Sequence, residues 1–576
     1  MLLIQTCIIL VNDMTASLYT AITFSPVQGF IEKSRKLRDL YGSSFILSFL
    51  SRALCDAARR HLRSDAAVDL AKDPVVSPAL VNVTQGTPNQ IVIQGDFPED
   101  LTHRTLTKAW QAIVDICRDE VERRLPAAKL PGHYTWHRAW DAWGNHTWEC
   151  FWAQGESISD ARDRLNEAKR GRAWVGINWQ GESSTLSGAD AIAWYGMAEK
   201  MHPKANFGEQ YHQIRDYCRK LSQALPLTLI DETEQLSIPE LIKRVLMIKD
   251  AEKNPQAFQH RVKDRFQALG LPAVEPPAFF TEVNRFAEER WTGWFQGDGD
   301  RIGRFLKSSG GEKPDVLHAF SKAMLAWGSR FQVEFKAHGR VVYAGGDDFL
   351  GIFYRHQPEP PLSGQAVLSY FSQFPTVWES HGQRDAEGRL LTVSVGLVWA
   401  APNVPQRDIL QHCKEAEQAA KRGGRDRLCL RVLFNSGNYL EWQCPWWLLA
   451  GRHPALAKQG IFGRYRDLQD QSGPAASWDD LFKDVATLEA RHGFRPGSEV
   501  ALALFEIYFG AELAAIVKAY SWDQDSYTGI LGNQERSAKN TQQRLTQWVI
   551  NLAKVGFHLH RSQSSKPQPD AIAALP

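Results

Sequence analysis

The stretch at 343–350 contains the residues of this chain that are best suited to chemistry. Two glycines, Gly345 and Gly346, precede two adjacent carboxylates, Asp347 and Asp348, and apolar runs flank all four. This pattern predicts a β-hairpin with the acidic pair at its tip. Adjacent carboxylates repel each other, so a fold keeps them close mainly where a cation neutralises them. Oxygen ligands on a glycine turn suit Mg²⁺ that holds a nucleotide triphosphate, because glycine lets the backbone approach phosphate.

A second acidic turn precedes this hairpin in the chain. Asp298 and Asp300 lie in a glycine-rich stretch at the end of a predicted strand. The segment between the two turns, 314–335, has apolar residues at spacings of three and four, which predicts a helix. In a ferredoxin-like sheet the first strand and the hairpin are neighbours. We therefore expect Asp298, Asp347 and Asp348 at one edge of the sheet, where they could share two metal ions.

The elements that follow complete this arrangement. Periodicity predicts, in order, helix 364–380, strand 391–399, helix 406–422 and strand 428–433. The whole reads βαββαβ, the palm shared by nucleotidyl cyclases and many polymerases. Lys421 and Arg425, at the end of the last helix, could bind a triphosphate tail, with Arg425 engaging phosphate oxygens in a fork. A basic pair at a helix end is also typical of a solvated surface.

The N-terminal third predicts the same order of elements. The predicted segments are strand 19–25, helix 28–61, strands 75–83 and 90–94, helix 105–125 and an apolar segment at 147–152. This again reads βαββαβ, so the chain holds two diverged copies of one palm. The first copy has no Gly-Gly-Asp-Asp at its hairpin. We expect it to be a structural partner that contributes backbone and polar contacts to a second nucleotide.

The motifs together resemble a known family. Three of them resemble, in this order, the second Palm domain of the large subunit of type III CRISPR–Cas effector complexes, at 297–303, 345–348 and 421–425. Three more are similar to the first Palm of that subunit, at 19–31, 34–44 and 87–90. The Cmr (III-B-like) branch is the nearest match. The resemblance implies an α+β protein with two ferredoxin-like Palm domains related to GGDEF cyclases, plus helical inter-domain and C-terminal domains.

The domain boundaries follow from these motifs and from composition. We expect a leader at 1–17, whose first residue is not the native start, and a first Palm at 18–155. A linking helical domain at 156–285 and a second Palm at 286–440 follow. The chain then forms a C-terminal helical domain at 441–561 and a flexible tail at 562–576. The C-terminal part reads as three helical segments, at 478–492, 498–519 and 540–555.

The resemblance also implies a mechanism and a set of site residues. Asp298 and Asp347 would bind Mg²⁺ or Mn²⁺ directly, with Asp348 supporting and the Gly299 carbonyl as a further ligand; the three aspartates would be catalytic. One ion would lower the pKa of an attacking ribose 3′-hydroxyl of ATP. The nucleotide would be bound by residues that flank these ligands, namely Asp300, Gly303, Gly345, Gly346, Lys421 and Arg425. The products implied are cyclic oligoadenylates, made when target RNA pairs with guide RNA among the other Cmr-type subunits.

Composition sets bounds on this interpretation. The chain has 576 residues, a formal net charge of +2 and eight scattered cysteines without a CxxC pair. The balanced charge leaves any RNA contact to local patches, and we expect a cytoplasmic chain with neither a disulfide framework nor a membrane partner. Many family members carry a Cys-rich zinc element between the Palms, but the corresponding stretch, 179–188, has no cysteine, so no zinc is expected.

Two residue clusters leave alternatives open. One zinc site is possible in principle at His133, His137, His146 and Cys150, although surface histidines are the favoured interpretation. The tryptophans concentrated at 136–152 could stack on RNA bases, but we favour core or subunit interface.

Other functions remain open alongside the cyclase. No His-Asp pair occurs in the chain, so we expect no HD-type DNA cleavage. The chain could be a catalytically silent scaffold that binds RNA in the same complex. It could also be a diguanylate-type cyclase, or an RNA polymerase of the viral GDD type. Nucleotide preference and template dependence would separate the enzymatic alternatives.

Overall fold

The computed structural model describes most of the chain, namely residues 18–63, 73–79, 86, 88–125, 133–172, 176–179, 181–197, 206–226, 229–248, 257–273, 290–311, 313–355, 359–456, 460–463, 477–495, 498–524, 527–532 and 538–560. Two compact units emerge from its contacts, one of residues 1–282 with 306–325 and the other of residues 283–305 with 326–576. None of the described helices is both long and apolar enough to cross a membrane.

The first unit is built around a four-stranded antiparallel sheet. Its strands are β1 (Tyr19–Ser25), β2 (Val75–Ser77), β3 (Ile91–Gln94) and β4 (Glu149–Gly155). They lie in the order β2-β3-β1-β4, with β1 paired to both β3 and β4. This is the ferredoxin-like order that βαββαβ predicts. The predicted strand at 75–83 is shorter in the structure, and residues 80–83 lie outside the described part.

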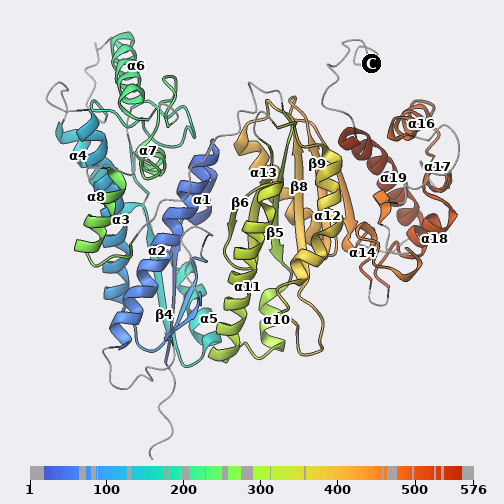
Figure 1. Ribbon diagram of the computed structural model, residues 1–576, viewed down its shortest axis with the longest axis horizontal. Coiled ribbons are helices and arrows are strands. Elements are labelled where there is room, and N and C mark those ends of the chain that lie inside the picture. The colour runs from blue at the N-terminus through green and yellow to red at the C-terminus, as the bar shows by residue number, and fades with distance from the viewer. Residues whose placement is uncertain are drawn as a thin grey trace, which may run out of the picture. The chain divides into compact units, whose positions relative to one another are not determined.

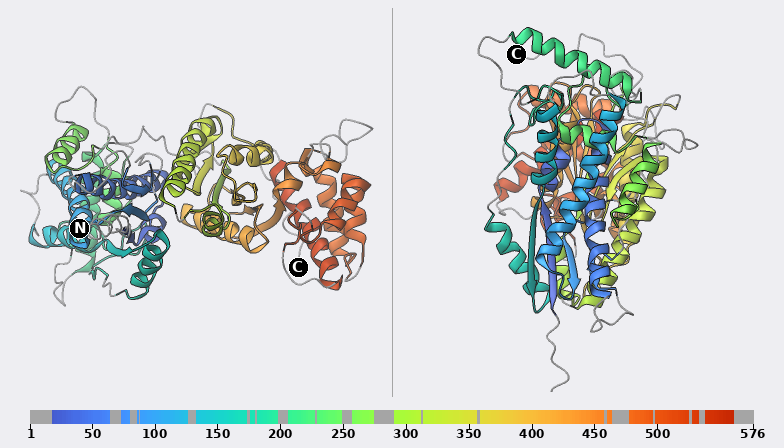
Figure 2. Two further views of the ribbon diagram at one scale, coloured as in Figure 1. Left: turned by 90° about the horizontal axis from the view of Figure 1, so that it is seen from below. Right: turned by 90° about the vertical axis from the view of Figure 1, so that its left-hand side faces the viewer.

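Helices cover both faces of this sheet. On one face lie α2 (Leu37–Arg63) and α3 (Glu99–Arg124), and on the other lies α5 (Ile158–Arg170), which contacts β4 and β1 (Figures 1 and 2). The unit also contains α4 (His133–His146), α6 (Phe207–Ala224) and α8 (Phe258–Ala268). Trp136 and Trp140 of α4 are fully buried, so this part of the tryptophan cluster belongs to the core, as favoured above.

The single helix predicted at 28–61 is wrong, because the chain forms two helices there. Helix α1 (Val27–Glu32) ends before a polar segment, and α2 begins at Leu37. The carboxylate of Asp39 accepts hydrogen bonds from the backbone N–H groups of Arg35 and Lys36, at 3.1 and 2.9 Å. These bonds satisfy donors that a helix start leaves free, and they fix the beginning of α2.

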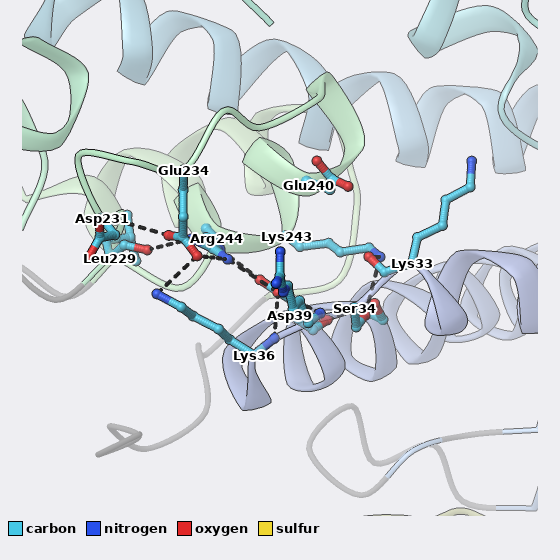
Figure 3. Close-up of polar contacts among 12 residues, drawn as sticks. Lys33, Ser34, Lys36, Asp39, Leu229, Asp231, Glu234, Glu240, Lys243 and Arg244 are labelled. Carbon is cyan, nitrogen blue, oxygen red and sulfur yellow. Dashed lines mark hydrogen bonds and ion pairs between the residues drawn. The ribbon is translucent and has the colours of Figure 1, made fainter. Parts of the chain in front are cut away.

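Asp39 also joins α2 to a short buried helix, α7 (Ile238–Val245). The Asp39 carboxylate pairs with the Arg244 guanidinium of α7 at 2.7 Å, and both side chains are completely buried (Figure 3). Arg244 pairs in turn with Glu234, which also receives Lys36 at 3.0 Å. Buried charges are tolerated only when paired in this way. The segment that resembles the first Palm is therefore held to α7 by a buried ion pair.

The second unit contains a six-stranded mixed sheet. Its strands are β5 (Thr292–Gly299), β6 (Gly339–Ala344), β7 (Asp348–Phe353), β8 (Val393–Ala400), β9 (Arg427–Leu433) and β10 (Tyr439–Pro445), in the order β10-β9-β8-β5-β7-β6. The four strands β8-β5-β7-β6 have the ferredoxin-like order, β8 and β9 are parallel, and β10 pairs with β9 in an antiparallel fashion. The sequence did not predict β10, which crosses the expected domain boundary at 440.

Aromatic packing joins this sheet to its helices. On one face lie α11 (Pro314–Glu334) and α12 (Gly364–Glu379), and on the opposite face lies α13 (Gln406–Arg422) (Figures 1 and 2). Phe295 of β5 is fully buried, with ring centroids 5.2 Å from Phe335 and 5.6 Å from Phe371. Burial of each such ring contributes roughly 1.5–3 kcal/mol. The end of β5, and with it Asp298, is therefore held rigidly.

Helices make up much of the C-terminal part of the second unit, and the four longest of those described there follow residue 477. They are α16 (Trp478–Ala490), α17 (Val500–Phe509), α18 (Ala511–Ala519) and α19 (Ala538–His560). The single predicted helix at 498–519 is wrong, because Gly510 adopts a φ of 86° between α17 and α18. This left-handed backbone suits glycine and ends a helix. Helix α19 packs on β10, where Trp548 Nε1 donates to the Gln443 carbonyl at 2.7 Å.

Candidate functional site

The sheet of the second unit brings the two acidic turns together. Asp298 lies directly opposite Asp348 in the antiparallel register of β5 and β7. The Gly299 N–H donates to the Asp347 carbonyl at 3.0 Å. A Cβ on Gly299 would lie 3.1 Å from the Asp347 Cβ and 2.9 Å from Ile302 Cδ1, so glycine permits this close approach. The three aspartates named from the sequence thus share one edge of the sheet.

Their electrostatics are those of crowded carboxylates. Burial raises the pKa of Asp347 above the usual Asp value, and the charge of Asp298 raises it further. The pKa of Asp348 is raised by loss of surrounding water and by the charges of Asp347 and Asp298. Because the Asp348 side chain is exposed, we regard the neighbouring charges as its decisive cause. Charge repulsion of this kind favours a bound cation or proton.

Lys421 supplies a positive charge at this edge. Its ammonium group forms an ion pair with Asp298 and a second with Glu417 at 2.6 Å. Burial lowers the pKa of Lys421, but these hydrogen bonds outweigh it and raise the pKa overall. Asp298 and Lys421 remain about one-third exposed, with side-chain values of 30% and 29%. Solvent, and therefore a ligand, can reach both groups.

Asp300 occupies a different environment from the other aspartates. It is 5% exposed, and its carboxylate accepts hydrogen bonds from Ser394 Oγ at 2.7 Å, Thr392 Oγ1 at 3.0 Å and the Asp426 N–H at 3.0 Å. Burial raises its pKa. These three bonds fix Asp300 to β8 and to the turn that follows α13. Contact between Asp300 and a nucleotide stays a prediction.

Arg425 lies in that turn rather than on the helix. Helix α13 ends at Arg422, and Arg425 and Asp426 have φ values of 69° and 51°. The Arg425 N–H donates to the Ala420 carbonyl at 3.1 Å, which closes the turn onto the helix end. Lys421 and Arg425 therefore do not share a helical face, although they are four residues apart in the chain. They still lie at the same end of the sheet.

The predicted glycines are placed around these groups. Gly345 and Gly346 connect β6 to β7 before Asp347, and Gly303 lies in the short helix α10 (Ile302–Ser308). A Cβ on Gly303 would have no atom within 4 Å. The backbone beside Gly303 is thus open to a ligand, whereas the binding role of all three glycines stays a prediction.

Sequence reasoning missed three residues of this edge. Glu417 precedes Lys421 by one helical turn, a spacing that could have revealed the pair. Ser394 is fully buried in β8, and nothing in the sequence marks it as a partner of Asp300. Asp426 has its pKa raised to about 7, by burial and then by the charge of Asp300. Its position after the Gly-Gly-Arg turn was the only available signal.

The donor set fits a hard divalent cation by its chemistry. It consists of carboxylate oxygens whose mutual repulsion a cation would relieve. As the side chains are placed, however, the described residues contain no group of three or more His, Cys, Asp or Glu side chains in position to hold a metal ion.

Comparison with known protein families gives two matches. Residues 292–429 match the family described as Cas10/Cmr2, second palm domain. Residues 19–125 match the family described as CRISPR-associated protein Cmr2, N-terminal. No curated protein matches the chain.

Solved structures of Csm1–Csm4 assemblies are also similar. One is a Csm1–Csm4 cassette in complex with cA4, at 13% sequence identity and a TM-score of 0.46. Others are the Csm1–Csm4 subcomplex in the type III-A CRISPR-Csm interference complex, at 15% and 0.46, and a cassette in complex with AMPPNP, at 14% and 0.42. Each similarity covers 95% of this chain and 70% of the other.

The two family matches include all six sequence stretches on which the resemblance was based, three in each match. The second-palm match contains Asp298, Asp347, Asp348 and Lys421, and the N-terminal match contains the anchored segment around Asp39. The resemblance seen in the sequence is thereby confirmed. The chain belongs to the Cas10/Cmr2 family, the large subunits of type III CRISPR complexes.

Proposed function

We propose that this chain is a nucleotidyltransferase that makes cyclic oligoadenylates from ATP within an RNA-guided type III CRISPR complex. The observation that carries the proposal is the meeting of Asp298, Asp347 and Asp348 at one exposed edge of the sheet, with the pKa values of Asp347 and Asp348 raised and with Lys421 beside them. Perturbed, crowded carboxylates at an accessible edge are typical of catalytic sites. Membership of the family makes a palm-type nucleotide reaction the leading candidate.

The roles of the residues follow from their charges and positions. Asp298, Asp347 and Asp348, with the Gly299 carbonyl, would hold Mg²⁺ or Mn²⁺, which supplies charge neutralisation and activates a ribose 3′-hydroxyl. Lys421 and Arg425 bind the phosphate chain and stabilise the charge of the pyrophosphate leaving group. Phosphate binding requires Lys421 to exchange Asp298 for a phosphate oxygen. Asp300 keeps the turn of Arg425 in place through its bond to the Asp426 N–H.

A product assay tests the proposal. The chain is purified within its RNA-loaded complex and is given labelled ATP, Mg²⁺ and cognate target RNA. The matched variants are Asp347→Asn/Asp348→Asn and, as a control, Asp408→Asn, which changes an exposed carboxylate on α13. We expect RNA-dependent oligoadenylate from the wild type and the control and none from the double variant.

Two other results would reject the cyclase. Absence of product from an intact, target-bound complex with either Mg²⁺ or Mn²⁺ would favour the silent scaffold. A product made from GTP in preference to ATP would favour the diguanylate-type reaction. The ion pair of Lys421 with Asp298 is the feature that a scaffold would retain, because it stabilises the edge without any metal.

A further inference from the structure

The second unit contains a cavity that is lined by none of the three aspartates and that no step above uses. Its volume is about 390 Å³, within the range of about 300–1,000 Å³ that is usual for small-molecule sites. Residues from the end of α13, from β10, from the 530–531 loop and from α19 line it. All of these elements belong to the second unit.

The lining is positively charged. Arg422 and Arg544 contribute two guanidinium groups, and Glu441 contributes the carboxylate. That carboxylate is engaged by Arg431 at 2.8 Å, outside the lining. The described residues hold no carboxylate within ion-pair distance of Arg544, which donates instead to the Leu531 carbonyl at 2.6 Å and lies 5.0 Å from the Trp522 ring. A cation without an anionic partner is the feature that an anionic ligand would complement.

Hydrogen-bond donors in the lining are also unsatisfied. Arg544 Nη1 and Trp442 Nε1 are buried and have no hydrogen-bond partner among the described residues. An atom buried in this way can bond to a ligand only after its side chain turns toward the cavity, and the cost of leaving a buried donor unpaired favours that movement. The side chains of Gln547 and Asn551 add amide groups, which bond to each other at 2.8 Å. These groups can recognise the polar edge of a planar ring as well as phosphate.

The cavity adjoins the turn that carries the candidate phosphate-binding residues. Gly423 lines it directly, between Lys421 and Arg425. On the far side of the turn, Arg427 donates to the Ile530 and Gly529 carbonyls at 3.1 and 2.8 Å. The 529–531 loop, which Arg544 contacts through the Leu531 carbonyl, is therefore the same loop that Arg427 contacts at the end of the turn.

From this geometry we propose that the cavity binds a small phosphate-bearing ligand of mononucleotide size, independently of divalent metal. The guanidinium groups of Arg544 and Arg422 receive the phosphate, and the amides of Gln547 and Asn551 face the remainder of the ligand. This site is separate from the proposed cyclase site, because it contains none of the carboxylates Asp298, Asp347 and Asp348.

Calorimetric titration of the full chain in EDTA tests the proposal. The probes are AMP, inorganic phosphate and adenosine. We expect AMP to bind most tightly, inorganic phosphate more weakly and adenosine not at all. Omission of Mg²⁺ keeps the probes from metal-dependent binding at the acidic edge. The outcome of this titration is therefore independent of whether the chain makes oligoadenylates. Binding of adenosine as tight as that of AMP, or no binding of any probe at millimolar concentration, would overturn the inference.

Variants locate the site. Arg544→Gln should weaken AMP binding about tenfold or more, because a charged hydrogen bond is lost. Gln547→Glu and Gln547→Lys change the charge of an exposed lining residue without touching the core, and they should weaken and strengthen binding respectively. Gln543→Glu, on the same helix but outside the lining, is the matched control. If the three lining variants bind AMP as the wild type does, the cavity is not the site.

Discussion

The ammonium group of Lys421 forms an ion pair with the carboxylate of Asp298 across 123 residues of sequence. The pair links the last turn of α13 to the end of β5, on the edge that also carries Asp347 and Asp348. A metal ion would bind the Asp298 carboxylate of this pair, and a phosphate group would bind the Lys421 ammonium group. Either ligand must therefore displace the pair, and this competition sets the first prediction.

Replacement of Lys421 should separate nucleotide binding from stability. Lys421→Met removes one phosphate contact, and we expect the KM for ATP to rise about 10- to 150-fold, the usual range for a hydrogen bond to a charged group. The free energy of unfolding should change by less than about 1 kcal/mol, because the pair is partly exposed. Arg407→Met, on the exposed face of α13, is the control. An unchanged KM would show that Lys421 serves only to neutralise Asp298.

The crowded carboxylates predict a pH-dependent stability. Because the pKa values of Asp347 and Asp348 are raised in the fold above the usual 3.8, the folded chain retains protons that the unfolded chain has released. The stabilisation by these two groups is therefore complete at pH values below the usual pKa, and it is lost as the pH rises through the raised pKa values. Melting temperatures in EDTA should fall more steeply between about pH 5 and pH 8 for the wild type than for Asp347→Asn/Asp348→Asn.

Added Mg²⁺ supplies the second arm of that measurement. If the aspartates bind the ion, Mg²⁺ should raise the melting temperature of the wild type near pH 8 and leave that of the double variant unchanged. Parallel pH curves for the two proteins would contradict the raised pKa values. An equal Mg²⁺ effect on both proteins would place the ion elsewhere.

Asp300 should act by positioning the turn of Arg425. The double variant Thr392→Val/Ser394→Ala removes two of the three hydrogen bonds to Asp300 and leaves its carboxylate in place. We expect it to increase amide hydrogen exchange at 425–427 and to lower kcat as Asp300→Asn does. If Asp300 instead contacts the nucleotide, Asp300→Asn should raise the KM for ATP while the double variant leaves it unchanged.

Two glycines of the acidic edge offer a matched pair of substitutions. Gly299→Ala places a Cβ 2.9 Å from Ile302 Cδ1 and 3.1 Å from the Asp347 Cβ, so we expect a loss of about 1–3 kcal/mol in unfolding free energy. Gly303→Ala meets no atom within 4 Å and lies in a helix, so stability should hold or rise by up to about 1 kcal/mol. Urea unfolding measures both. Activity lost in a stable Gly303→Ala protein would indicate close approach of the nucleotide there.

The buried pair of Asp39 and Arg244 should dominate the stability of the first unit. Arg244→Met leaves a completely buried carboxylate without its guanidinium, and we expect a loss of about 3–5 kcal/mol. Lys36→Met, which breaks only the more exposed pair with Glu234, should cost less than about 1 kcal/mol. The double variant Asp39→Asn/Arg244→Met, which removes the buried charge and keeps an oxygen acceptor for the N–H groups of Arg35 and Lys36, should recover part of the loss in urea unfolding. Equal costs for Arg244→Met and Lys36→Met would show that the buried pair contributes little.

Local patterns account for what could be predicted. Alternating apolar residues and the Gly-Gly-Asp-Asp turn predicted β5, β6 and β7, and an antiparallel pairing then places Asp298 opposite Asp348. The periodicity of 406–422 predicted α13 with its bounds unchanged. Where the sequence pattern was continuous but the backbone was not, prediction failed. The turn before Asp39 and the left-handed Gly510 each interrupt a segment whose apolar spacing continues across the break.

The sequence by itself determined the family, the βαββαβ order of elements around each sheet without β10, and the three aspartates at one edge, because these depend on local periodicity and on motif order. Only the tertiary structure decided the partners. The pairing of Lys421 with Asp298, of Ser394 with Asp300 and of Asp39 with Arg244 joins residues that are far apart in the chain. No local pattern encodes such contacts, because they arise only when packing excludes water and leaves each buried charge to find the nearest opposite group.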